Sequence, residues 1–588
     1  MKRDVETNDG LKESSHPNSR KEKRKIAYFS MEIGLDSNIP TYSGGLGVLA
    51  GDTIRACADL NVPIIAVTLL YRDGYFCQKL DALGKQEESP YKWKPENLLN
   101  PLPVKVSVQI EKRTVLVQPW EYIVTGISDY PVPVIFLDTD IPDNTAYDRS
   151  LTHYLYGGDE KYRLCQETIL GIGGVRMLKE LGYHEIGRYH MNEGHSSLLT
   201  LELLNERRKT EERRRKATRI GEEDSDWDVD GVRRMCVFTT HTPVLAGRDQ
   251  FSYDLVSQVL GGFVPVDFLK RHGGTDRLNM TLLAMNLSHY ENGVAKEHGK
   301  VSRILFPGYH IESITNGVYS RNWVYDSFKT LFDKYISGWR GDPFSLRYAL
   351  SIPKPEIWNA HQEAKRRLID YVKDKTSVSM DSEVLTIGFA RRATAYKRAD
   401  LVFSDVQRLM SISRNVGKMQ FVFSGKAHPK DLPGKELIRK VISVSRQLKD
   451  QVKIVYLENY DMELAKMLIS GVDLWLNTPR KPEEASGTSG MKAAHNGVPS
   501  LSILDGWWIE GCIEGVTGWS IGTAATEESS DAEDSSYLYD KLEKVVVPTF
   551  YRDRDKWIDM MRHSIAINGS FFNTHRMVQQ YVLSAYMY

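Results

Sequence analysis

The sequence predicts an α/β protein of two doubly wound domains that face a central cleft. Three observations support this fold class. The chain has 588 residues, whereas a single hydrophobic core stops growing at roughly 250 to 300 residues. Short apolar runs suit strands that are buried on both faces of a sheet. In the second half these runs alternate with helical patterns, which indicates a parallel sheet of the Rossmann-like kind.

The individual elements follow from these patterns. In the first half, strands are predicted at residues 26–30, 63–69, 133–137 and 235–238, and helices at 52–60 and 162–181. In the second half, strands are predicted at 384–390, 420–424, 452–457, 472–476 and 500–504. Helices are expected at 355–372, 400–412, 434–447 and 462–470. Ligands of such sheets bind beyond the carboxyl ends of the strands, which places the expected cleft there.

The patterns divide the chain into four segments. Residues 1–24 are charged and polar, which predicts a disordered tail. N-terminal and C-terminal Rossmann-like domains are expected at 25–317 and 318–565. The last segment, 566–588, is expected to form a helix that packs back on the N-terminal domain. The mostly charged stretch at 205–234 is interpreted as an exposed excursion.

Composition excludes several classes of function. Lys plus Arg and Asp plus Glu both number 77, so nothing global indicates a nucleic acid or an acidic membrane as partner. The five cysteines are scattered and have no CxxC spacing. This pattern argues against a disulfide framework or a metal site and favours a reducing cytoplasm. The amino-terminal segment lacks the apolar core of a signal peptide, and no apolar run approaches 18 residues.

The most informative segment is Glu484-Ala-Ser-Gly-Thr-Ser-Gly-Met-Lys492. Small residues let the backbone approach a ligand closely, and a helix that begins there would direct free amides at an anion. A partly desolvated Lys492 can lose its proton and bond covalently to an aldehyde. The alternative is a capped helix with a solvated lysine.

This segment resembles the pyridoxal phosphate site of the α-glucan phosphorylases, and Lys492 matches the lysine that carries the cofactor. With Leu504-Asp-Gly-Trp-Trp508, it is similar to the shorter bacterial and archaeal branch of that family. Further family segments occur in the same order over roughly residues 25 to 580. The resemblance implies a GT-B type of fold, pyridoxal 5'-phosphate as cofactor, and phosphorolysis of α-1,4-glucans such as glycogen and maltodextrin.

A second segment, Gly388-Phe-Ala-Arg-Arg-Ala-Thr-Ala-Tyr-Lys-Arg398, places four cations after a predicted strand. Arg offers a bidentate fork to phosphate and Lys a point charge, although a solvated basic loop is an equal alternative. The resemblance implies that Arg391 and Arg392 bind phosphate, that Lys397 bridges toward the cofactor phosphate, and that Tyr396 lines the site. Thr394 stands where many members of the family have His.

The remaining candidates are shorter motifs. Thr41-Tyr-Ser-Gly-Gly-Leu-Gly47 precedes a helical pattern and resembles the family loop whose Gly44 and Gly45 amides face phosphate and cofactor. An ordinary turn is the alternative. For the terminal glucose, the resemblance implies contacts from His241 and Asn316. It also implies contacts from Glu484, Ala485, Ser486 and Gly487.

Three further matches concern the surroundings of the cofactor and of the sugar. Lys426 and Tyr460 resemble residues near the cofactor, and Gly490 lies in the cofactor segment. Asn192-Glu-Gly-His195 matches a family motif with Asp in place of Glu193. Glu193 and His195 could equally form a buried structural pair.

The implied reaction uses phosphate as both nucleophile and proton source. The substrate phosphate protonates the glycosidic oxygen, with the cofactor phosphate behind it, and then attacks from the face that the glucan left, so the anomeric configuration is retained. His241, Arg392 and Lys397 are the catalytic candidates. Clustered cations and glycine amides offset the repulsion between the two phosphates.

Two alternatives remain open at this point. One is a nucleotide-sugar-dependent glucan synthase of the same fold, which lacks a cofactor lysine. The other is a catalytically inactive carbohydrate-binding homologue. A homo-oligomer is compatible with the sequence. The first predicted strand begins near Lys25, so the N-terminal allosteric control of larger family members is not expected.

Overall fold

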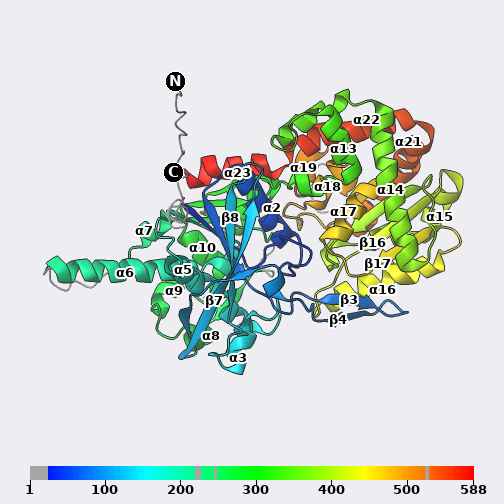
Figure 1. Cartoon of the computed structure of the whole chain (residues 1–588). Coiled ribbons are helices and arrows are strands. Elements are labelled where there is room, and N and C mark those ends of the chain that lie inside the picture. Colours follow the sequence, from blue (N-terminus) through cyan, green and yellow to red (C-terminus); the bar gives the residue numbers. More distant parts are fainter. Residues whose placement is uncertain (1–23, 219–226, 244–247, 523–528, 588) are drawn as a thin grey trace, which may run out of the picture.

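The computed structural model describes residues 24–218, 227–243, 248–522 and 529–587. Apart from Arg24, the predicted tail lies outside these residues. The chain forms two large sheets with helices around them (Figure 1). The predicted α/β class with parallel sheets is therefore confirmed. No helix in the described ranges is long and apolar enough to cross a bilayer.

The first sheet has ten strands and is parallel over most of its width. Its order is β14 (Ile311–Ser313), β13 (Tyr290–Gly293), β10 (Cys236–Thr239), β9 (Arg188–Asn192), β1 (Ile26–Phe29), β2 (Ile64–Leu69), β8 (Pro131–Asp138), β7 (Arg113–Thr125) and β5 (Asn100–Pro101). Alternate residues of β1 and β2 enter different hydrophobic clusters on the two faces. This burial on both faces explains why the strands appear as continuous apolar runs.

One edge of this sheet is antiparallel, which the sequence did not predict. β7 pairs in antiparallel fashion with β8, β5 and β6 (Val106–Ile110). The turn between β6 and β7 consists of Glu111 and Lys112, which both have positive φ, at 50° and 65°. Hairpin turns of this kind usually carry Asn-Gly or Asp-Gly, so the usual sequence signal is missing here.

The second sheet has six parallel strands. Its order is β17 (Lys453–Leu457), β16 (Met419–Ser424), β15 (Leu385–Ala390), β18 (Leu474–Asn477), β19 (Ser500–Ile503) and β20 (Gly518–Ile521). The predicted strands of this half are confirmed to within two residues at either end. The predicted helices correspond to α14 (Lys354–Thr376), α15 (Val406–Asn415), α16 (Leu432–Gln447) and α17 (Met462–Gly471). α15 begins later than predicted because Asp405 accepts the amide of Arg408 and caps the helix there.

The predicted helix at 162–181 is divided into three parts. α4 (Glu160–Thr168) passes through a π-helical segment, η3 (Ile169–Gly173), into α5 (Gly174–Glu180). A Cβ on Gly171 would lie 2.6 Å from the amide of Leu199. Glycine at this position allows the backbone of η3 to pack directly on the next helix, α6 (Leu199–Thr218). The apolar start of α6 is buried, and its charged continuation projects from the body of the molecule (Figure 1).

Within the last segment, α23 (Thr574–Tyr581) lies against the first sheet (Figure 1), whereas Ala566 before it packs in the core of the second half. In α23, Val578 packs in the same cluster as Ile54 of α2 (Gly45–Asp59). The hydroxyl of Tyr581 lies 3.1 Å from that of Thr239 and accepts a hydrogen bond from the side-chain amide of Asn292 at 3.0 Å. Burying these polar groups together keeps each of them hydrogen-bonded.

A short hairpin from the first half of the chain reaches the second sheet. It consists of β3 (Cys77–Leu80) and β4 (Gln86–Ser89) (Figure 1). Gln78 donates to the carbonyl of Gly425 at 2.9 Å, and Asn459 donates its amide to Gln78 at 2.8 Å. Gln86 both donates to the carbonyl of Ala427, at 2.8 Å, and accepts its amide, at 3.0 Å.

Replacing Asp473 by Ala should strongly destabilise the second half of the chain. The Asp473 carboxylate lies 2.6 Å from Nζ of Lys365 and 2.8 Å from Nε2 of His361, and all three side chains are buried. Loss of the carboxylate leaves a buried lysine without its ion partner, which costs about 3–5 kcal/mol of unfolding free energy. Denaturant unfolding measures this change.

Glu463→Ala is the control, because it removes an exposed ion pair with Lys466. It should change the unfolding free energy by less than about 1 kcal/mol. Equal losses in the two variants would contradict the prediction.

Candidate active site

The candidate residues of the second sheet all follow the carboxyl ends of its parallel strands. β15 leads to Arg391 and Arg392, β16 to Lys426, β17 to Tyr460 and β18 to Glu484. Since neighbouring parallel strands end at the same edge, these side chains come from one edge of the sheet.

Glu484 lies between two of the predicted phosphate ligands. Its carboxylate is 2.5 Å from Nη2 of Arg391 and 3.3 Å from Nζ of Lys397, and all three side chains are largely buried. Burial alone would raise the pKa of Glu484, but the two cations hold it at about 2. Burial and the adjacent Arg391 lower the pKa of Lys397 to about 7. Lys397 therefore exchanges its proton near neutral pH.

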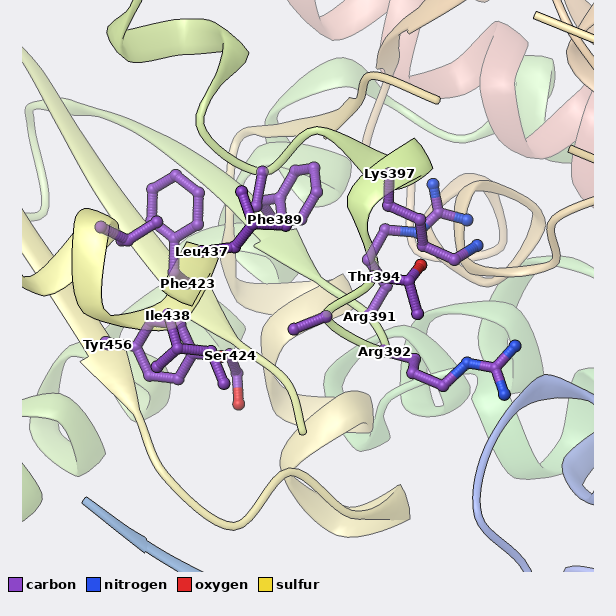
Figure 2. Close-up of a pocket in the computed structure, with 13 residues that line it drawn as sticks. Phe389, Arg391, Arg392, Thr394, Lys397, Phe423, Ser424, Leu437, Ile438 and Tyr456 are labelled. Carbon is purple, nitrogen blue, oxygen red and sulfur yellow. The ribbon is translucent and has the colours of Figure 1, made fainter. Parts of the chain in front are cut away.

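The loop after β15 divides its four cations into two groups. Arg398 turns inward, where it donates to the carbonyls of Thr478 and Pro479 and pairs with Asp534 at 2.7 Å. This arginine is structural. Arg391, Arg392 and Lys397 extend together to the side away from Phe389 and Phe423, as Figure 2 shows. Together with Phe389, Phe423 and Ile438, these three residues line one small pocket behind the loop.

Arg392 stands out because its guanidinium is unpaired. The side chain is exposed and forms no hydrogen bond or ion pair with any residue that the structure describes. The hydroxyl of nearby Thr394 is buried and also has no partner. Because Arg392 is unpaired and lies beside Arg391 and Lys397, its guanidinium can bind an anion.

Lys492 is buried on α18 (Ser489–Ala494). Its Nζ lies 3.6 Å from the centre of the Trp323 ring and has no hydrogen bond to the described residues. Burial lowers the pKa of Lys492 to about 8, whereas Asp52 acts to raise it. Asp52 in turn accepts Nε1 of Trp323 at 2.6 Å. The lysine is thus desolvated and readily deprotonated, as covalent bonding to an aldehyde requires.

The helix α18 depends on close packing at Gly490. A Cβ there would lie 2.7 Å from the ring of Trp507. Gly490 is therefore required for the fold of this segment, and the structure gives it no polar contact of its own. Ser486 accepts the amide of Trp507 through its carbonyl at 2.9 Å, while the Ser486 hydroxyl is buried without a partner.

The glycine loop before α2 is held by a carboxylate that the sequence did not single out. Glu32 accepts the amide of Ser43 at 2.6 Å and the hydroxyl of Tyr156 at 2.8 Å. A Cβ on Gly44 or Gly45 would contact nothing within 4 Å, so space lies open beside this loop. α2 begins here without a side-chain cap or an acidic residue in its first turn, which leaves amides free for an anion.

His241 follows β10 and is joined to the Asn192–His195 segment. Its Nε2 lies 2.6 Å from Oδ1 of Asn192, and its amide donates to Glu193 at 2.7 Å. Burial lowers the pKa of His241 to about 3, so the ring is neutral. The suggested Glu193–His195 pair is wrong. Glu193 binds His241 and Thr242, whereas His195 accepts the amide of Met31 at 2.9 Å.

Asn316 lies in the loop after β14 and is 4% exposed. Its Oδ1 is buried and has no hydrogen-bond partner. Buried polar atoms are nearly always hydrogen-bonded, so a ligand could form the missing hydrogen bonds to Oδ1 of Asn316 and to the Ser486 hydroxyl. Gly487 has φ +69°, a conformation that other residues rarely adopt. Ala485 lies in the same segment but shows no contact that indicates a role.

Lys426 and Tyr460 lie beside the hairpin of β3 and β4. Nζ of Lys426 donates to the carbonyl of Phe76 at 3.0 Å, and burial lowers its pKa to about 8. Burial raises the pKa of Tyr460, which keeps its hydroxyl protonated. Tyr396 lies under Nζ of Lys397, 4.5 Å from its ring centre.

Sequence reasoning missed residues whose partners are distant in the chain. Glu32 and Tyr156 support the glycine loop, Asp52 and Trp323 surround Lys492, and Asn477 accepts a hydrogen bond from Arg391. For Glu32 and Asn477 the sequence offers one indication, because both lie at or just beyond the end of a buried strand, where ligands of such sheets bind.

No cluster of three metal-ligating side chains occurs among the described residues.

Comparison with known proteins identifies the family. The family described as "Carbohydrate phosphorylase" matches residues 266–518. The maltodextrin phosphorylase of Thermococcus litoralis is 41% identical, over 95% of this chain and 70% of that protein. The chain belongs to the α-glucan phosphorylase family. The glycogen phosphorylase of Aquifex aeolicus is 33% identical over 86% of its length, and that of Mycobacterium tuberculosis is 36% identical over 70%.

Replacing Glu484 by Gln should lower the pKa of Lys397 further below its value of about 7, because the carboxylate is the group that raises it. Acetylation of cofactor-free protein, followed by peptide mass spectrometry, gives the pH at which Lys397 reacts at half its maximal rate. This midpoint should fall in the variant. Exposed Lys300 should behave alike in both proteins, and an unchanged Lys397 profile would rule the coupling out.

Proposed function

We propose that this phosphorylase uses inorganic phosphate to release the terminal α-1,4-linked glucose of glycogen or maltodextrin as α-glucose 1-phosphate, with retention of configuration. The observation that carries the proposal is Lys492. It is buried, free of hydrogen bonds to the described residues and lowered in pKa to about 8. A lysine prepared in this way suits the covalent attachment of pyridoxal phosphate.

We further propose that the halves at 25–317 and 318–565 are two Rossmann-like domains of a GT-B arrangement. Support comes from the strand ends. β9 and β10 lead to Asn192 and His241 in the first half, and β15 and β18 lead to Arg391 and Glu484 in the second. A substrate in a shared cleft could then contact both sets.

The described residues fit pyridoxal 5'-phosphate. Lys492 would hold it covalently, and Lys426, Tyr460, Arg391 and the amides near Gly45 and Gly490 would surround it. When bound, the cofactor supplies a phosphate group that supports proton transfer by the substrate phosphate. The unpartnered Lys492 amine and the open space beside Gly45 are the structural observations that favour this fit.

The cations of the β15 loop would bind the substrate phosphate. Arg392 is unpaired and Lys397 exchanges its proton near pH 7, so the pair can follow the charge of a phosphate that loses and regains a proton. The Gly44 amide, which also donates to Glu32 at 3.4 Å, would add a neutral donor. Repulsion between two phosphates at close range is thereby reduced.

The terminal glucose would contact side chains from both halves of the chain. Oδ1 of Asn316 and the hydroxyl of Ser486 are buried and unpartnered, and sugar hydroxyls satisfy such atoms. Glu484, Ala485 and Gly487 would line the same face. His241 is neutral and fixed by Asn192 and Glu193, so its carbonyl can stabilise positive charge that develops on the sugar ring.

The proposed location of the protein is the cytoplasm. A reducing compartment suits its five free cysteines.

Replacing Lys492 by Ala should abolish cofactor attachment and reduce glucose 1-phosphate release from maltodextrin by roughly 10³-fold or more. Borohydride reduction of the wild-type protein should fix one pyridoxyl group, on the peptide that contains Lys492. Lys300→Ala serves as the control and should retain both properties. Undiminished phosphorolysis by cofactor-free Lys492→Ala would contradict the proposal.

Asn316→Ala and Ser486→Ala should each raise the KM for maltodextrin about tenfold, because each removes a hydrogen bond worth about 1 kcal/mol or more to the sugar. Steady-state kinetics at saturating phosphate measure the effect. Ser470→Ala is the control, since that buried hydroxyl donates to the carbonyl of Lys466 away from the site. A KM unchanged in both variants would refute the sugar assignment.

A further inference from the structure

The loop that carries Asn316 is bound by two charged side chains from other parts of the chain. Arg576 lies on α23, near the end of the chain, and Glu510 lies on α19 (Trp508–Gly511), which follows β19 of the second sheet. Neither residue belongs to β14, the strand that precedes this loop. Neither has a role in the proposed reaction.

Arg576 binds the backbone on both sides of the Thr315–Asn316 peptide. Its Nη1 donates to the carbonyl of Thr315 at 2.6 Å, and its Nη2 to the carbonyl of Asn316 at 2.9 Å. Its Nε donates to the carbonyl of Phe571 at 3.1 Å, and it forms no ion pair with a described residue. The planar guanidinium can hold two adjacent carbonyls in fixed geometry, which a lysine cannot.

Glu510 holds the same loop from the other side. Its two carboxylate oxygens lie 3.0 and 2.9 Å from the hydroxyl of Thr315, and one of them accepts the amide of Lys296 at 3.0 Å. The Glu510 side chain is 10% exposed. Charge-assisted hydrogen bonds of this kind are stronger than neutral ones.

The backbone of the C-terminal segment completes the contact. Val318 donates its amide to Phe572 at 3.1 Å and accepts the amide of Thr574 at 3.0 Å. A Cβ on Gly317 would lie 2.3 Å from the backbone of Asn573. These contacts fix the backbone of the loop, while Oδ1 of Asn316 is buried without a hydrogen-bond partner.

We propose that Arg576 and Glu510 are positioning residues for Asn316, so that recognition of the terminal glucose depends on the C-terminal helix. This inference rests on the proposed function, because it assumes that Asn316 binds the sugar. Arg576 orients the peptide planes on either side of Asn316, and Glu510 fixes Thr315. Together they hold the Asn316 amide toward the substrate at no cost in reorganisation when the glucan binds.

The test compares Arg576→Met, Arg576→Lys and the control Arg554→Met. Arg554 is also partly buried and stacks on Trp358 and Phe550, but contacts no residue of the site. With saturating phosphate, Arg576→Met should raise the KM for maltodextrin about tenfold and change kcat by less than about twofold. When phosphate is varied at saturating maltodextrin, the KM for phosphate should also change by less than about twofold. Arg576→Lys should show a smaller rise. Arg554→Met should leave the KM for maltodextrin unchanged.

A double-mutant cycle separates positioning from a general loss of stability. In the Asn316→Ala background, Arg576→Met should no longer affect the KM, because the residue through which it acts is gone. Additive effects in the cycle would overturn the inference. If Arg576→Met fails to fold, Thr315→Val removes the hydroxyl bound by Glu510 and should raise the KM in the same selective way.

The proposed function and this inference fail in different ways. Absence of glucose 1-phosphate release by the wild-type protein would refute the function itself. A raised KM in Asn316→Ala together with a normal KM in Arg576→Lys, Arg576→Met and Thr315→Val would refute the inference alone.

Discussion

The buried carboxylate of Glu484 and the cations that hold it determine the character of this site. Arg391 and Lys397 lie within 3.3 Å of it, so one carboxylate offsets only part of their combined charge. Arg392 and Lys492 have no ion pair within the described part of the chain. Arg392 therefore adds a positive charge that no contacting carboxylate neutralises, and such a charge at the edge of a sheet favours anionic ligands. The positions of Tyr396 and of the β15 loop follow from this arrangement.

Charge alone would not select a sugar phosphate, and the first sheet contributes the rest. Its strand ends carry neutral polar groups, notably the His241 ring held by Asn192 and the unpartnered amide of Asn316. In the proposed function, the second sheet would supply most of the cations for phosphate, and the first would supply neutral polar groups for the sugar beside Ser486 of the second. The Glu32 carboxylate holds the glycine loop of the first half, and its charge acts on Arg392 of the second.

The sequence predicted five of the six strands of the second sheet, because buried parallel strands are continuous apolar runs. In the first sheet it predicted only β1, β2, β8 and β10, because strands such as β9 and β13 contain polar residues. It predicted the main site segments because they resemble a known family. It could not reveal contacts that depend on distant pairs. Nothing near Glu193 in the sequence shows that it binds His241 rather than His195. The Glu111-Lys112 turn lacks the residues that usually mark a hairpin. In the sequence, Arg398 and Arg391 are equally good candidates for phosphate binding, but in the structure Arg398 forms an ion pair with Asp534.

The hairpin of β3 and β4 has a consequence for motion. Gln78 and Gln86 bind the backbone of Gly425 and Ala427, the residues on either side of Lys426. If the two sheets moved apart as rigid bodies, these hydrogen bonds of Gln78 and Gln86 would have to break. Rotation about the hairpin would keep them intact. These bonds therefore favour relative movements of the two sheets that leave Lys426 beside the hairpin.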